Sequence, residues 1–413
     1  MPNNHMIISV IAAVASIANV HAEETPISGL PTDSAVEIIQ ESLDNYDVEA
    51  PQEVEVRVGT IGHSNGDFYY LHTQPYSSFE GPTLSLHLNS QQFTRDAEYF
   101  LKETKGYTAA GFIAEPTLKF RSREWEPVNI EAGAQILGIA GDDHRLHVNP
   151  IFRIEYQPTD WLRIIGGTIY GNLNHGLYEP MYDFDRYFYN NQEDGLQVML
   201  VKEWKHIMVT SDTWLNWENF LEPGEFEQEK FTIGSSNRII FGDENKKLFQ
   251  IPIDILGTHR GGQFSAIEDT CLETIFNACT GLDLMIGDHV RTTALVFGYK
   301  NNSNEIWTPY KGGFGLYPII SYYNKSYMLS AGYWYGNKYI GTRGSYLFQN
   351  RSKYDEDFAV KHRNMITGKW YYVHGIFALE AQAYYDLKEN KMDFSFGLYL
   401  KFNKDFKLLD RDI

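Results

Sequence analysis

Several features of common protein classes are missing from this sequence. After residue 22 no segment approaches about 18 consecutive apolar residues, whereas a helix needs about 20 to cross a bilayer. No transmembrane helix is therefore expected in the rest of the chain. The sequence also lacks a Walker loop, a dinucleotide fingerprint, and HExxH or CxxC patterns. We accordingly expect no cofactor and no metal site.

Basic residues are scarce. The chain has 35 Lys and Arg against 54 Asp and Glu, which gives a formal net charge of -19. Nucleic acid is a poor partner for such a chain, because contacts to phosphates need clustered Lys and Arg. Aromatic residues are in contrast abundant at 15%, which suits the aromatic girdles of a membrane-embedded barrel.

Cysteine is nearly absent. Cys271 and Cys279 are the two cysteines, eight positions apart in "DTCLETIFNACTG". Two cysteines are too few for a disulfide scaffold, but an exported protein could join them across one small loop. We predict this loop disulfide in preference to two free thiols.

The N-terminus has the pattern of an export signal. An apolar run from Ile7 to Val20 is followed by a small-residue cleavage site that ends at Ala22, although no Lys or Arg precedes the run. We predict a signal peptide over residues 1–22. Residues 23–80 are acidic and are predicted to be a periplasmic lead-in segment.

From residue 81 onward the chain alternates apolar and polar residues, which indicates β-strands. The last hairpin is the clearest: every second residue is apolar from Phe377 to Tyr385 and again from Met392 to Phe402, with Lys388-Glu389-Asn390 between the arms. Sixteen strands are expected, although fourteen would also fit. The expected strands span residues 81–92, 107–121, 126–138, 145–157, 160–172, 194–204, 206–218, 229–241, 247–258, 281–288, 290–300, 312–324, 326–336, 363–373, 375–387 and 391–403.

The lengths of the connections indicate how these strands assemble. Connections after odd-numbered strands are mostly long, and those after even-numbered strands are mostly tight. Outer-membrane barrels sort their loops in this way, with long external loops at one rim and short periplasmic turns at the other. The sequence therefore predicts an all-β protein: one antiparallel transmembrane β-barrel over residues 81–403, with a C-terminal tail at 404–413. Phe406 could alternatively belong to the last strand.

In this barrel the apolar faces point to lipid and the polar faces line the lumen. The candidate lumen and selectivity residues are Lys119, Arg121, Arg153, Arg163, Glu115, Glu131, Glu155, Asp212, Trp214 and Glu218. These residues could set the selectivity of a pore, or could form salt bridges that fill the lumen. The long segments 259–284 and 337–362 could fold inward as a plug. Trp214 and Trp217 could stack on sugars, but a girdle role is favoured, especially for Trp217 on the lipid side.

Three stretches carry a resemblance to known proteins: "GLYEPMYDFDRYFYNNQEDGLQ", "TWLNWENFLEPGEFEQEKFTIGSS" and "GTHRGGQ". With these stretches, the chain from about residue 80 onward resembles a group of uncharacterised outer-membrane β-barrel proteins of Bacteroidetes. The resemblance implies the fold and the location, but no catalytic residues.

One motif was tested for enzymatic chemistry. "IGHSNGD" contains His63 and Ser64 next to each other. Barrels of the phospholipase A and lipid A deacylase types resemble one another in an H-x-S-N element, in which His and Ser lie two apart on one strand face, whereas here the two residues are adjacent. Adjacent residues on a strand point to opposite faces, so His63 could not activate Ser64 directly. A turn is the favoured interpretation.

The sequence thus predicts a bacterial outer-membrane, porin-like barrel that is not an enzyme and that passes or binds small polar solutes. Its expected partners are outer-membrane lipid and such solutes, and a homo-oligomer is compatible with the pattern. A barrel-embedded lipid hydrolase and a non-conducting surface barrel with partner-binding loops are the alternatives.

Overall fold

A computed structural model describes residues 84–121, 127–143, 146–189, 192–220, 228–242, 247–261, 272–287, 289–303, 308–324 and 326–409. The predicted signal peptide, the lead-in segment, His63 and Ser64 lie outside these residues. Within them, no helix is long and apolar enough to cross a membrane.

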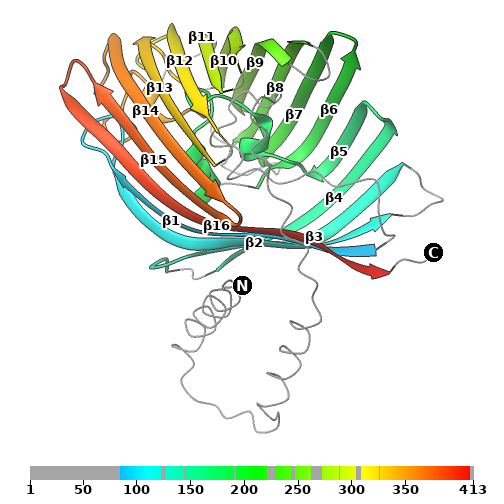
Figure 1. The fold of residues 1–413 in the computed structure, drawn as a ribbon. Helices are drawn as coiled ribbons and strands as arrows, with labels where there is room; N and C mark the ends of the chain where they lie inside the picture. Colours follow the sequence, from blue (N-terminus) through cyan, green and yellow to red (C-terminus); the bar gives the residue numbers. More distant parts are fainter. Residues whose placement is uncertain are drawn as a thin grey trace, which may run out of the picture. The chain divides into compact units, whose positions relative to one another are not determined.

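Sixteen strands of the described chain form a closed antiparallel barrel, as predicted (Figure 1). Each strand pairs with its neighbours in sequence, and the first strand closes the ring against the last. The strands are β1 (Leu84–Glu98), β2 (Tyr107–Arg121), β3 (Val128–Ile139), β4 (His147–Thr159), β5 (Leu162–Thr168), β6 (Asp194–Trp204), β7 (Ile207–Asn219), β8 (Glu229–Gly242), β9 (Lys247–Gly261), β10 (Glu273–Ile286), β11 (Val290–Asn301), β12 (Gly312–Tyr323), β13 (Tyr327–Asn337), β14 (His362–His374), β15 (Phe377–Asp386) and β16 (Lys391–Leu409).

Several strand boundaries differ from the sequence-based prediction, and the differences in β10 and β16 are among the largest. Strand β10 begins at Glu273, eight residues before the predicted start at 281. The inward row of this strand mixes the apolar Ile275 and Cys279 with the polar Asn277 and Asp283, which obscures the alternation. At the C-terminus, β16 continues through Phe406 to Leu409, because β1 offers it pairing partners as far as Leu84. Most of the predicted tail is therefore strand.

The outward faces of the strands are apolar. Large exposed hydrophobic side chains recur on alternate residues around the wall, such as Phe152 and Ile154 on β4 and Phe396 and Leu398 on β16. In a closed barrel all strand backbone groups are paired, so such a wall can face acyl chains. The long connections gather at one rim, which we take as the external rim because outer-membrane barrels sort their loops in this way.

Two of the long external connections fold into the lumen. Residues 169–193, the β5–β6 segment, contain two short 3-10 helices, η2 (Asn172–His175) and η3 (Phe184–Phe188). Residues 338–361, the β13–β14 segment, contain η4 (Tyr346–Phe348). Both lie inside the ring of strands in Figure 1. The sequence predicted inward folding for the second segment but not for the first.

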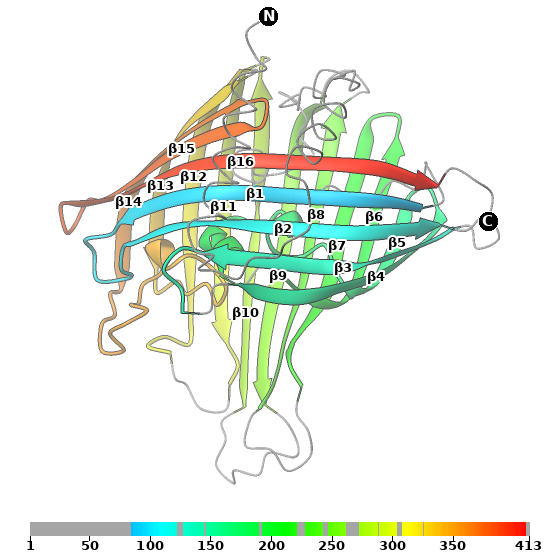
Figure 2. The same ribbon diagram turned by 90° about the horizontal axis from the view of Figure 1, so that it is seen from below.

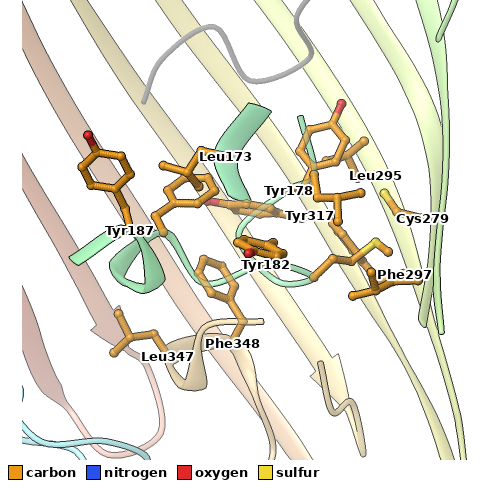
Figure 3. Close-up of a cluster of buried hydrophobic side chains, with 14 of the residues drawn as sticks. Leu173, Tyr178, Tyr182, Tyr187, Cys279, Leu295, Phe297, Tyr317, Leu347 and Phe348 are labelled. Atoms are coloured by element: carbon orange, nitrogen blue, oxygen red, sulfur yellow. The ribbon is translucent and has the colours of Figure 1, made fainter. Parts of the chain in front are cut away.

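The two segments build an aromatic core inside the barrel. Figure 3 shows Tyr182 and Phe348 from the segments meeting Tyr317 and Phe297 from the wall. The rings of Tyr317 and Phe348 lie 5.4 Å apart between centroids, and Phe297 packs edge-on against Tyr178. This core is fully buried, so the lumen at this level is packed with side chains.

Candidate functional site

The residues predicted to line the lumen lie on the inward-facing rows of their strands. Six of them are at least nine-tenths buried: Glu115, Glu131, Arg153, Glu155, Asp212 and Trp214. Lys119, Arg163 and Glu218 retain 16%, 20% and 12% of their side-chain exposure. Arg121 is the last residue of β2 and lies opposite Asn129 of β3, whose side chain is buried. The alternation of the sequence therefore placed these side chains on the correct face. Their role in solute selectivity stays a prediction.

On the β2–β5 side, the predicted residues pair with one another and with the β5–β6 segment. Arg153 donates to Glu131 at 2.7 Å and lies over the ring of Tyr170 at 3.7 Å from its centroid. The hydroxyl of Tyr170 donates to Glu155 at 2.6 Å. These contacts are those of a filled interior, in which the charges hold an inserted segment against the wall.

On β7, the predicted residues anchor both inward segments. Asp212 accepts a hydrogen bond of 2.8 Å from the Nδ1 of His175, and Trp214 stacks on the same imidazole at 3.5 Å. Glu218 pairs with Arg343 of the β13–β14 segment and, at 2.9 Å, with Lys230. Of the residues that suggested sugar binding, Trp214, Asp212 and Glu218 are thus occupied within the protein.

His175 is held between two carboxylates in the β5–β6 segment. Its Nε2 contacts Glu193 at 3.0 Å, while its Nδ1 contacts Asp212. Burial alone would lower the pKa of His175, but the two carboxylates raise that pKa to about 9. The same contacts lower the pKa of Glu193 to about 2 against the opposing effect of burial. Because both ring nitrogens donate, this imidazolium has no free lone pair to act as a base.

The predicted disulfide is wrong as far as Cys279 is concerned. Cys279 is a free, buried thiol on β10, and it faces the aromatic core of the lumen (Figure 3). The prediction assumed that both cysteines lie in a loop, whereas β10 begins before Cys279. Cys271 lies outside the described residues.

A different set of groups faces the membrane near the external rim. His259 and Thr274 are register partners on β9 and β10, and their outward side chains hydrogen-bond at 3.0 Å between Nδ1 and Oγ1. The sequence pattern put His259 at the start of the segment 259–284, which was expected to be a long connection that could fold inward. That placement is wrong, because β9 continues to Gly261 and turns His259 outward.

Aromatic side chains surround this pair on the outer wall. The ring of Phe231 lies 4.9 Å from that of His259, and Trp217 lies 5.7 Å from Phe231. Trp217 is 43% exposed on the outward face of β7, where the sequence predicted a girdle residue. Such girdles mark the depth at which acyl chains meet headgroups. The imidazole and the hydroxyl thus lie beside outward aromatic side chains near one end of β9 and β10.

Two further histidines pair at the external end of the barrel. The hydroxyl of Tyr335 contacts Nδ1 of His362 at 3.1 Å, and His147 contacts Asp142 at 2.6 Å. Of these pairs, only His259 and Thr274 join an imidazole to an aliphatic hydroxyl. No cluster of three or more His, Cys, Asp or Glu that could hold a metal occurs among the described residues.

Comparison with known proteins identifies the family. A family model described as lipid A 3'-O-deacylase-type matches residues 77–411. The chain belongs to this family. The protein is a β-barrel of the bacterial outer membrane, as predicted. No curated protein matches the chain significantly.

Membership of a deacylase-type family overturns the expectation that the protein is not an enzyme. Short contiguous motifs in the sequence gave no sign of an enzyme. In a barrel wall, however, functional groups meet across strands, and residues far apart in sequence form a site. His63 and Ser64, the pair tested as a hydrolase motif, also precede the matched region.

Solved structures of bacterial outer-membrane proteins match the chain at low identity. A loop-deletion mutant of OmpT from Vibrio cholerae is 11% identical, covers 78% of this chain and 100% of its own, and gives a TM-score of 0.49. OprD from Pseudomonas aeruginosa is 11% identical, covers 83% and 100%, and gives 0.42. OmpF of Salmonella typhi, in complex with daunomycin, is 10% identical, covers 78% and 98%, and gives 0.46. At these values the likeness carries nothing about function.

Proposed function

We propose that this protein is an outer-membrane lipid hydrolase that removes an ester-linked acyl chain from a lipid A-type glycolipid of the outer leaflet. The observation that carries the location of the site is the outward-facing hydrogen bond between His259 and Thr274. Family membership supports the reaction class, and the aromatic girdle beside the pair supports the depth at which it occurs.

The chemistry follows from the pair. A threonine hydroxyl is a weak nucleophile unless a base removes its proton. Nδ1 of His259 is in position to accept that proton as Thr274 Oγ1 attacks the ester carbonyl. The C–O bond to the sugar then breaks, and His259 returns the proton to the leaving sugar hydroxyl. Water, activated by the same imidazole, hydrolyses the acyl-threonine to release the fatty acid.

Lateral access favours this site over any group in the lumen. A diacylated or multiply acylated substrate remains in the leaflet, so its ester must be reached from the outer wall. His175 is fully buried and donates from both ring nitrogens, and the closed wall of strands separates it from lipid. Passage of small polar solutes, the function first expected, is disfavoured by the same two inward segments.

The test is lipid A analysis by mass spectrometry in a Gram-negative host that expresses the full chain. His259→Gln and Thr274→Val should each abolish loss of one acyl chain, by at least about 100-fold in rate, as expected for removal of a general base or a nucleophile. Thr274→Ser should retain activity, because serine keeps the hydroxyl. Barrel assembly is checked by the heat-dependent shift in electrophoretic mobility.

The chain offers a matched control. His362→Gln removes an outward histidine that also contacts a hydroxyl, that of Tyr335. A phenol contributes no aliphatic nucleophile, so this variant should deacylate at the wild-type rate. Full activity of an assembled His259→Gln variant would contradict the proposed site. If the wild-type chain changes no lipid A in hosts with several lipid A structures, the proposed reaction is wrong.

A further inference from the structure

The outward row of β1 changes its chemistry half-way along the strand. It begins at the periplasmic end with Leu84, Leu86 and Leu88 and continues upward as Ser90, Gln92, Thr94 and Asp96. We call these last four residues the β1 stripe. Gln92 and Thr94 are exposed on the outer surface. This inference goes beyond the proposed reaction and does not depend on it.

The stripe lies in a part of the wall that is otherwise apolar. Figure 2 shows β16, β1 and β2 running side by side. On β16, Phe402, Leu400 and Leu398 are the register partners of Ser90, Gln92 and Thr94. On β2 the partners of the same residues are Ala114, Phe112 and Ala110. Because the flanking side chains suit acyl chains, the polar row lies within the lipid-facing band.

A second group of outward polar residues, on β7 and β8, differs because its side chains hydrogen-bond to one another. On β7 and β8, Ser211 donates to Asn237 at 2.7 Å, and Asn237 donates to Ser235 at 3.0 Å and to a backbone carbonyl at 3.0 Å. Thr213 and Ser235 share a hydrogen bond of 2.8 Å. This set satisfies its own polar groups, so it can face lipid without a partner.

Most side chains of the β1 stripe have no hydrogen-bond partner within the described part of the chain. Within the described part of the chain, the side chains of Ser90, Gln92 and Thr94 make no hydrogen bond, and only Asp96 has a partner, the hydroxyl of Thr108 at 2.6 Å. A polar side chain that faces hydrocarbon without a partner is costly and marks a site of interaction. Something that offers donors and acceptors should therefore cover the stripe.

The length of the stripe selects the occupant. From Ser90 to Asp96 it extends about 20 Å along the strand, at about 3.3 Å per residue. The polar groups of a lipid gather near its headgroup, so one lipid could match the upper part of the stripe alone. A second barrel wall matches all of it. Amide and hydroxyl side chains both donate and accept, so the stripe is complementary to a copy of itself.

We propose that the β1 stripe is the interface between two copies of this protein, related by a two-fold axis along the membrane normal. Ala110 and Ala114 on β2 allow the walls to approach closely, as small residues do at membrane interfaces. Strand β9 lies eight positions from β1 in either direction around the ring. In the dimer, His259 of each copy therefore remains open to lipid.

The test is the oligomeric state of the full mature chain in lipid nanodiscs and in mild detergent, by native mass spectrometry and sedimentation. Wild type should be a dimer. Gln92→Leu combined with Thr94→Val should reduce the dimer fraction at least tenfold, while the barrel still assembles, because apolar residues suit this wall. The control, Thr213→Val combined with Ser235→Ala, removes both members of one outward hydrogen bond and should leave the dimer intact.

Cross-linking gives a second measurement. In a background with Cys271→Ala and Cys279→Ala, the Thr94→Cys thiols of two copies should be joined by a short thiol-reactive cross-linker in the outer membrane. Leu282→Cys, outward on β10 and 40% exposed, should not. A monomeric wild type, or a dimer that survives the Gln92 and Thr94 changes, overturns the proposal. A monomer that loses a bound lipid in the double variant assigns the stripe to lipid instead, and also overturns it.

Discussion

Arg343 of the β13–β14 segment forms an ion pair with Glu218 on the inward face of β7, far across the sequence. The two inward segments also meet at Arg343. The backbone carbonyl of Arg343 accepts a hydrogen bond from the backbone N–H of Asp183 at 2.6 Å, and Arg343 forms a parallel β-bridge with Tyr182. One residue thus joins both segments to the wall. The filled lumen depends on such joints, because neither segment belongs to the sheet.

The first prediction concerns this ion pair. Both side chains are nearly nine-tenths buried, so Arg343→Met leaves Glu218 with Lys230 as its remaining cationic partner. Breaking one side of a buried pair costs about 3 kcal/mol or more. We expect the inward segments to detach more readily, which raises the single-channel conductance in planar bilayers above that of the wild type.

Arg351→Met, which changes another arginine of the same segment, should leave the conductance unchanged. Equal conductance of wild type and Arg343→Met would show that the segments stay in place without the pair.

The second prediction concerns the contact between the segments. Gly341 and Gly344 lie against the carbonyl oxygen of Pro180: a Cβ on Gly344 would be 1.9 Å from that oxygen, and one on Gly341 would be 2.1 Å from it. No Cβ fits at such distances, and the obstacle is backbone. Gly344→Ala should therefore destabilise the packed lumen by a few kcal/mol, about 1–3, as overpacking does.

Limited proteolysis of the folded barrel measures this effect. Gly344→Ala should make the inward segments susceptible to cleavage while the barrel itself stays resistant. Gly298→Ala and Gly368→Ala are the matched controls, because a Cβ at either position meets no atom within 4 Å. If the Gly344→Ala protein resists protease as the controls do, the two segments are less tightly packed than described.

The strand pattern and the inward segments differ in how far the sequence could predict them. The bounds of β2 and β6 match the predicted ranges. The inward position of Glu155 and Asp212 follows from the same period. Their partners Tyr170 and His175 could not be predicted, because they come from a segment with no periodicity, and a contact between a loop and a wall leaves no regular spacing in the sequence.

The candidate hydrolytic pair was missed for a related reason. His259 and Thr274 meet only because β9 and β10 pair in one particular register. The sequence analysis ended the first strand at 258 and began the next at 281, so both residues fell in an expected loop. Asn277 and Asp283 share the inward parity of β10, while Phe276 and Leu282 share the outward one, and this spacing was the signal that could have extended the strand toward lower residue numbers.

The third prediction concerns the pH dependence of the His175 clamp. In the folded protein the pKa of His175 is about 9, above its ordinary value of 6.5, because Asp212 and Glu193 stabilise the imidazolium against the effect of burial. A folded pKa above the unfolded one means that folding favours the protonated form. The clamp therefore contributes its full stability below about pH 6.5 and loses it as pH rises through about 9. At one pKa unit per 1.36 kcal/mol, the contribution is about 3 kcal/mol.

This dependence can be measured by urea unfolding of the barrel in detergent at several pH values. His175→Gln should be less stable than wild type at pH 6, and the difference should shrink steadily between pH 7 and pH 10.

Glu193 gives the opposite pH dependence at acidic pH. Because its pKa is lowered to about 2, its contribution to stability is present above about pH 4.5 and is lost as pH falls toward 2. His362→Gln, a change at an exposed histidine, should show no such trend. A stability difference for His175→Gln that stays constant from pH 6 to pH 10 would mean that the imidazole is neutral between its two carboxylates, and would return His175 to the set of possible bases.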